Sequence, residues 1–301
     1  MSLRIFSLVL LLSGGLCAAD WSKVPDLPHK VVVDWAQLPD GWNLGQTAGV
    51  AVDANDHVWV YNRGEHPVIE FDKNGQFIQS FKEPNYVSAH GIEIDADGDV
   101  WLIDVAGHSV VEYSPTGRVK LAIAGEGDND AEYGFNRPTG IVFRPDGGFY
   151  VSDGYINTRV VQYTKDAVYV RHWGTKGTGD GQFNLVHDVT IDNRGRLYVA
   201  DRGNSRIQVF DSDGEFLATW TDIGTPWGVE FVAAENAIYV TDGVNNHVLK
   251  LDLHGKILGR LGGFGKAQGL MDFPHHIAVD SEGSIYVAEI KNWRVQKFVK
   301  P

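Results

Sequence analysis

The sequence repeats one unit six times, and this internal period limits the possible folds more than any other feature. Each unit contains alternating apolar and polar residues, then an acidic or glycine-rich turn, then further alternating stretches. Alternation with a period of two indicates β-strands, and D-x-x-G-like turns at 95–98 and 192–195 predict tight hairpins. Units of roughly 40 to 50 residues with about four short strands have the size of propeller blades. We therefore predict an all-β, six-bladed β-propeller, with units that begin at Gly49, Gly91, Gly140, Asp188, Gly228 and His276.

The last unit lacks one strand. It ends near Phe298 after three strands, whereas an unassigned apolar stretch, Lys30–Trp35, precedes the first unit. Pairing this stretch with the last unit would complete the sixth blade and close the ring, which removes an exposed sheet edge. We expect residues 20–301 to form one propeller domain closed in this way, and we expect it to be a monomer.

The N-terminal segment has the pattern of an export signal. Residues 2–16 hold one arginine followed by an apolar run that is too short for a comfortable membrane span. Small residues at 17–19 provide a cleavage site, so we predict a secretory signal peptide over 1–19 and a secreted or periplasmic protein. Lipidation at Cys17 is the alternative, but Leu16 disfavours it because lipoprotein processing normally needs a small residue there.

The charge balance excludes two classes of partner. A formal net charge of −13 leaves no basic stripe that would neutralise phosphates. We therefore expect no binding to nucleic acid and none to anionic membrane surfaces. After cleavage the chain would hold no cysteine, so its stability has to come from core packing and ring closure.

Histidine occupies one equivalent position in every second unit. Alternate blades of a six-bladed ring are related by about a third of a turn, so three such side chains can point at the axis from three sides. Three neutral imidazoles with an open fourth position are typical of a catalytic zinc site, although iron or cobalt also accepts these ligands. We predict that His90, His187 and His275 bind one divalent metal; the alternative is that each histidine only caps a strand. The six equivalent residues, just before each innermost strand, are Ala48, His90, Thr139, His187, Trp227 and His275.

Strand parity selects further candidates for the same site. In an antiparallel meander, the loop between the second and third strands lies on the face where the first strand begins. In the third unit this loop, 153–159, has one extra residue and carries Tyr155. A break in a regular array is a place where function is expected. Arg63 and Arg202 stand directly after the repeated Asn or Asp of units one and four, whereas we interpret Arg159, Arg206 and Arg294 as ordinary repeat residues.

The repeat resembles the NHL family, through the run VADRGNSRIQVF at 199–210 and the G-x-G-x-F turn at 179–183. The candidate site residues also make the chain similar to the peptidyl-α-hydroxyglycine α-amidating lyases. These propeller enzymes cleave a C-terminal hydroxyglycine to give a peptide amide and glyoxylate. The matching runs are 62–66, 89–91, 152–155, 185–187, 199–202 and 274–275.

The resemblance implies roles for the candidate residues. It implies a zinc ion held by the three histidines, with Tyr155 as catalytic base and with Arg63 and Arg202 organising the substrate carboxylate or the tyrosine. The family's structural calcium uses an aspartate directly after the third histidine; His276 occupies that position here, so we do not expect structural calcium. We expect no fused hydroxylase domain, so a separate hydroxylating monooxygenase or the environment would have to provide the substrate.

We therefore expect a zinc-dependent carbon–nitrogen lyase that acts on a peptidyl or N-acyl α-hydroxyglycine, as a small molecule or a peptide. Two alternatives remain open. One is a related lyase that acts on another α-hydroxy acid amide, such as ureidoglycolate. The other is a non-catalytic periplasmic propeller whose histidine-bearing face binds a ligand or a protein.

Overall fold

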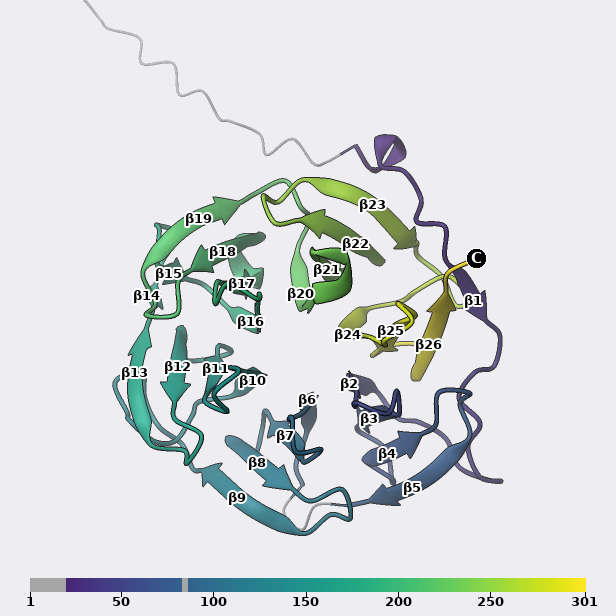
Figure 1. Cartoon of the computed structure of the whole chain (residues 1–301), viewed down its shortest axis with the longest axis horizontal. Helices are drawn as coiled ribbons and strands as arrows, with labels where there is room; N and C mark the ends of the chain where they lie inside the picture. Colours follow the sequence, from purple (N-terminus) through teal and green to yellow (C-terminus); the bar gives the residue numbers. More distant parts are fainter. Residues whose placement is uncertain (1–19, 83–85) are drawn as a thin grey trace, which may run out of the picture.

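The computed structural model describes residues 20–82 and 86–301, so the predicted signal peptide and Cys17 lie outside the described residues. Six four-stranded antiparallel sheets are arranged around a central axis (Figure 1). This arrangement confirms the predicted six-bladed β-propeller. Within the described residues the helical segments are single 3₁₀ turns, and none is long and apolar enough to cross a membrane. They are η1 (Trp21–Lys23), η2 (Arg202–Asn204) and η3 (Ala233–Glu235).

Each blade is a meander that runs from the channel outward. Blades one and two contain β2 (Thr47–Val52), β3 (Val58–Asn62), β4 (Val68–Phe71) and β5 (Phe77–Phe81), then β6 (Ala89–Ile94), β7 (Val100–Asp104), β8 (Ser109–Tyr113) and β9 (Val119–Ala124). Blades three and four contain β10 (Pro138–Phe143), β11 (Phe149–Asp153), β12 (Arg159–Tyr163) and β13 (Tyr169–Trp173), then β16 (Val186–Ile191), β17 (Leu197–Asp201), β18 (Arg206–Phe210) and β19 (Phe216–Trp220). Blade five contains β20 (Pro226–Val232), β21 (Ala237–Asp242), β22 (His247–Asp252) and β23 (Ile257–Gly262). A short parallel pair, β14 (Thr175–Lys176) and β15 (Gln182–Phe183), connects blades three and four.

The sixth blade joins the two ends of the chain. It contains β24 (Pro274–Val279), β25 (Ile285–Glu289), β26 (Arg294–Val299) and, as its outer strand, β1 (Lys30–Val32). Lys30 faces Val299 and Val32 faces Lys297 in antiparallel register, which confirms the predicted closure of the ring. The strand is shorter than the predicted Lys30–Trp35, because Asp34 adopts a left-handed φ of 49° and turns the chain away from β26.

The predicted D-x-x-G turns form the hairpins between first and second strands. The Gly98 N–H donates to the Asp95 carbonyl at 3.0 Å, and Gly98 has a φ of 83°, a conformation in which a side chain would be strained. The Asp95 carboxylate in turn accepts a hydrogen bond from the Trp101 indole at 2.9 Å. Each such turn therefore also anchors the next strand.

The hydrophobic core lies between neighbouring blades. In one cluster, Ile207 of blade four is buried together with Ile238 and Leu249 of blade five. At the closing seam, Trp35 packs its ring 5.5 Å from Phe71 of blade one and 5.2 Å from Tyr286 of blade six. Packing of this kind holds the inner strands at fixed angles around the channel, and so fixes the positions of the residues that begin them.

Candidate metal centre

A β-bulge interrupts the innermost strand of every blade at the position predicted to face the axis. In blade two, for example, the register with β7 passes from Ala89 directly to Gly91, so His90 has no partner on the neighbouring strand. A bulge redirects the side chain of its extra residue. The corresponding jumps are Thr47 to Gly49, Pro138 to Gly140, Val186 to Asp188, Pro226 to Val229 and Pro274 to Ile277.

The structure brings the three predicted histidines together. The ring centroids of His90 and His187 are 4.8 Å apart, those of His90 and His275 are 4.6 Å apart, and those of His187 and His275 are 4.8 Å apart. All three side chains are buried. Three imidazoles from blades two, four and six thus form a nearly equilateral triangle.

Each of these histidines is oriented by a carbonyl group of the next blade. The Nδ1 atoms donate to the carbonyl oxygens of Thr139, Trp227 and Ala48, at 2.6, 3.0 and 2.7 Å respectively. A carbonyl can only accept, so each Nδ1 carries the proton and each Nε2 keeps a free lone pair. The axial residues of blades one, three and five thereby fix the tautomer in which Nε2 is able to bind a metal.

The donor set fits a divalent transition metal. His90 Nε2 is buried and has no hydrogen-bond partner among the described residues. Burial is the main cause that lowers the pKa of His90, His187 and His275 well below the usual histidine value, and neighbouring imidazoles lower it further. The charge of Arg202 also lowers the pKa of His90 and His187. The three rings therefore remain neutral near pH 7, which is the protonation state of a metal ligand.

A fourth imidazole lies beside this triangle, and the sequence did not predict it. Nitrogen atoms of His90, His275 and His276 lie within 4.8 Å of one another, so they form a second possible ligand set. However, His276 Nδ1 lies 2.7 Å from the Ala48 carbonyl, and its Nε2 lies 3.8 Å from the Asp188 carboxylate in the channel. Because His276 Nε2 also has no hydrogen-bond partner among the described residues, both ligand sets are possible, and the triangle with His187 is the one that includes the contact with the Tyr155 hydroxyl.

Tyr155 lies against the histidine triangle. Its ring centroid is 5.4 Å from that of His90 and 5.7 Å from that of His187, and its hydroxyl is 3.4 Å from His187 Nε2. Arg202 Nη1 donates to the same hydroxyl at 3.2 Å. The pairing of Asp153 with Arg159 leaves five residues in this loop, which confirms that it is one residue longer than the 201–206 loop of blade four.

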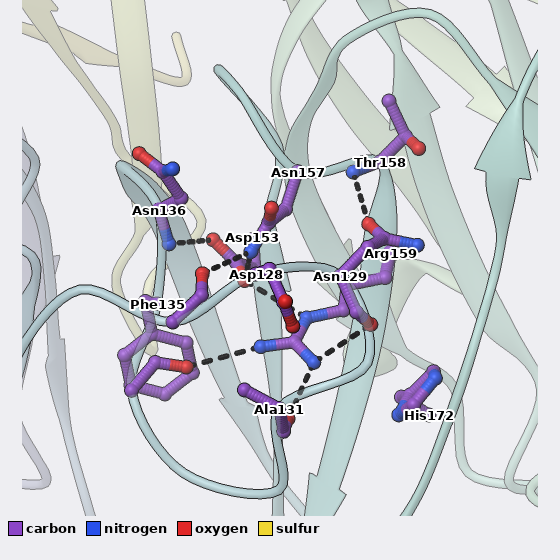
Figure 2. Close-up of polar contacts among 12 residues, drawn as sticks. Asp128, Asn129, Ala131, Phe135, Asn136, Asp153, Asn157, Thr158, Arg159 and His172 are labelled. Carbon is purple, nitrogen blue, oxygen red and sulfur yellow. Dashed lines mark hydrogen bonds and ion pairs between the residues drawn. The ribbon is translucent and has the colours of Figure 1, made fainter.

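The tyrosine loop is held by a buried ion pair (Figure 2). Arg159 Nε donates to the Asp153 carboxylate at 2.9 Å, and neither side chain is exposed to solvent. The other Arg159 nitrogens donate to the carbonyls of Asn129, Ala131 and Gly134, in the connection that precedes blade three. This network joins that connection to the loop that carries Tyr155, so Arg159 serves structure, as the sequence predicted.

The two predicted arginines occupy different places around the triangle. Arg202 stacks on Trp227, with its guanidinium carbon 3.7 Å from the ring centroid. Arg63 Nε donates to the carbonyl of Ala89, the residue before His90, at 3.0 Å. Arg202 therefore contacts the tyrosine directly, whereas Arg63 lies beside His90.

Sequence reasoning missed Arg137. Its guanidinium carbon lies 5.5 Å from the centre of the Tyr155 ring, and its carbonyl accepts a hydrogen bond from the Tyr155 N–H at 3.3 Å. It stands two residues before Thr139, at the position that Gln46 has in blade one and Phe273 in blade six. Aligning that position across the six units would have identified it.

Comparisons with known proteins match both the repeat and the fold. The family model described as "NHL repeat" matches residues 183–210. The human protein "NHL repeat-containing protein 3" is 31% identical over 94% of this chain and 87% of its own length. "Peptidyl-alpha-hydroxyglycine alpha-amidating lyase 1" of Drosophila melanogaster is 29% identical over 55% of this chain, and the match spans only 35% of that protein. A solved streptogramin B lyase has the same fold, with a TM-score of 0.66, 13% identity and coverage of 90% of this chain and 96% of its own.

Proposed function

This chain belongs to the NHL repeat family, and from that premise we propose that it is a zinc-dependent lyase that cleaves peptidyl or N-acyl α-hydroxyglycine to an amide and glyoxylate. One observation carries the proposal. The Tyr155 hydroxyl lies between His187 Nε2, at 3.4 Å, and Arg202 Nη1, at 3.2 Å, beside three neutral imidazoles. The similarity to the Drosophila lyase supports the same chemistry.

The metal would be held by Nε2 of His90, His187 and His275. When bound, zinc supplies a Lewis acid that favours loss of the proton from the substrate's α-hydroxyl group. Nothing in the donor set distinguishes zinc from iron or cobalt on chemical grounds, because imidazole suits all of them. Zinc is proposed because three imidazoles with an open position are its usual catalytic arrangement.

In this proposal Tyr155 acts as the base. Its oxygen lies at the edge of the histidine triangle, and the charge of Arg202 stabilises a negative oxygen there. Tyr155 takes the proton of the α-hydroxyl group, whose oxygen electrons then form the carbonyl of glyoxylate. The carbon–nitrogen bond breaks, its electron pair moves to the amide nitrogen, and that nitrogen takes up a proton.

The arginines divide two tasks in this proposal. Arg202 orients Tyr155 and is itself fixed against Trp227. Arg63 uses Nε for the Ala89 carbonyl and Nη1 for Gln46, which leaves Nη2 to hold the carboxylate beside the reacting carbon. A carboxylate fixed in this way keeps the hydroxyl group close to both the ligand triangle and Tyr155.

The test is glyoxylate release from a small N-acyl-α-hydroxyglycine by the purified zinc-loaded protein. We expect turnover that stops on chelation and returns with zinc. Tyr155→Phe should lower kcat by roughly 10²–10⁴-fold while bound zinc and the unfolding transition stay unchanged, because only the proton acceptor is lost. Tyr133→Phe removes a hydroxyl from an exposed tyrosine and is the matched control. If no glyoxylate forms with zinc bound, the non-catalytic binding propeller becomes the better explanation.

A further inference from the structure

We propose that Arg137 selects substrates whose acyl or peptidyl part carries a second carboxylate, close to the reacting hydroxyglycine. This inference rests on the proposed function and extends it to the choice of substrate.

Three arginines lie near Tyr155 or the histidines, and two of them are committed to the protein. Arg202 donates to the Tyr155 hydroxyl and stacks on Trp227. Arg63 donates to the Ala89 carbonyl and to the Gln46 side chain. Their positions are therefore set by neighbouring groups before any ligand arrives.

Arg137 differs from both. Within residues 20–82 and 86–301, its guanidinium group has no hydrogen bond and no ion pair, and its recorded contact is with the face of the Tyr155 ring, at 5.5 Å from the centroid. The side chain is exposed. All five N–H donors of the Arg137 guanidinium group therefore remain available. A bidentate bond to a carboxylate needs two of these donors on the same side of the group.

The place of Arg137 indicates which part of a substrate it would meet. Arg63 bonds to the carbonyl of Ala89, next to His90, and Arg202 bonds to the hydroxyl end of Tyr155. Arg137 instead contacts the Tyr155 ring and accepts a hydrogen bond from the Tyr155 backbone N–H through its own carbonyl. A carboxylate on the reacting carbon belongs near Arg63, so a group that reaches Arg137 has to come from the acyl or peptidyl side.

The arginine is also held in place at its backbone. Its carbonyl accepts the Tyr155 N–H at 3.3 Å, so Arg137 and the proposed base belong to one hydrogen-bonded unit. An exposed guanidinium group with free donors attracts an anionic group through its charge and can bind it bidentately. The chemistry that fits is an acidic residue before the hydroxyglycine, or a dicarboxylic acyl group.

Two ligands that cannot be cleaved test this without relying on turnover. N-succinylglycine and N-butyrylglycine lack the α-hydroxyl group and differ mainly in one carboxylate, and calorimetry on zinc-loaded protein gives their affinities. We expect the wild type to prefer the succinyl ligand, and Arg137→Gln to reduce that preference by roughly 3- to 10-fold. Added salt should weaken the preference in the wild type. Arg137→Lys should retain only part of the preference, because lysine keeps the positive charge but lacks the planar guanidinium donors that bind a carboxylate bidentately.

Arg118→Gln is the control, because it removes one exposed positive charge from the turn between β8 and β9. Equal ratios in the wild type and in Arg137→Gln would overturn the inference, as would failure of both ligands to bind. The corresponding α-hydroxyglycines then separate the two proposals. If both proteins release glyoxylate with the same preference for the succinyl over the butyryl substrate, the role of Arg137 is rejected and the lyase proposal stands. If binding shows a preference that depends on Arg137 but no glyoxylate forms, the lyase proposal is rejected and the anion site stands.

Discussion

Arg159 carries a positive charge at a place that solvent does not reach, since its side chain and that of Asp153 are both fully buried. Burying a charge is costly unless a counterion and hydrogen bonds compensate for the lost water. Here the carboxylate and the carbonyls of Asn129, Ala131 and Gly134 provide that compensation. The ion pair therefore holds the Tyr155 loop only while it is complete.

Arg159→Leu should destabilise the protein by about 3–5 kcal/mol, because it leaves Asp153 buried without its counterion. Urea unfolding of the metal-free protein measures the change. Arg171→Leu is the control, since Arg171 pairs with Asp213 at the surface at 3.1 Å, and its loss should cost no more than about 1 kcal/mol. Equal losses in the two variants would show that the buried pair is not a special support of this loop.

The sequence predicted this class of residue correctly because the repeat supplies copies of it. Arg206 pairs with Asp201 at 2.8 Å, and Arg294 pairs with Glu289 at 2.7 Å, in the same places of blades four and six. Arg137 has no such copies, and its significance depends on the position of Tyr155 in three dimensions. The alignment of the axial residues did not include it, because Arg137 stands two positions before the axial Thr139.

At the scale of the strand, one bulge per blade determines where the axial side chains point. The alignment located the axial residues, because equivalent positions share equivalent geometry in a repeat. It did not show that the carbonyls of the intervening blades orient the imidazoles, since such bonds join residues as far apart as His90 and Thr139. The convergence of His90, His187 and His275 was therefore predictable from the sequence, and their tautomers were not.

The Tyr155 loop also packs against the bulge of blade four. A methyl group on Gly154 would overlap the carbonyl of Val186, the residue before His187. Gly154→Ala should therefore displace either Tyr155 or His187, lower stability by about 1–3 kcal/mol and weaken zinc binding. Chemical unfolding and a zinc competition titration measure the two effects.

Gly179→Ala provides the comparison, because the added methyl group would meet only the flexible side chain of Gln182. It should change stability and zinc affinity less than Gly154→Ala. If both variants retain the zinc affinity of the wild type, the contact between the tyrosine loop and the blade-four bulge does not position His187.

Closing the ring collects acidic side chains in the channel, below the histidines. Glu93 of blade two and Glu230 of blade five line a cavity of about 30 Å³ together with Asp188 and His276. Burial raises the pKa of Glu93 to about 8 and that of Asp188 to about 7, and raises the pKa of Glu230 well above its usual range. Burial lowers the pKa of His276 to about 4, so this imidazole stays neutral and does not offset the carboxylates. No single blade contains this cluster, so it is a property of the whole ring.

These carboxyl groups make the stability of the molecule depend on pH. Unfolded Glu93 loses its proton near pH 4.5, whereas the folded protein retains it up to about pH 8, so between these values the folded state binds more protons. The free energy of unfolding should therefore fall as pH rises through this window, by at most about 1.4 kcal/mol per pH unit for one proton, and level off above it.

Glu93→Gln keeps the shape of the side chain and removes this contribution, so the stability of the variant relative to the wild type should rise from pH 4.5 to pH 8. Urea unfolding of metal-free protein across this range measures the difference, with Glu215→Gln at an exposed turn as the control for losing one negative charge. A difference between Glu93→Gln and wild type that stays constant or shrinks with rising pH would mean that Glu93 is already ionised in the folded channel.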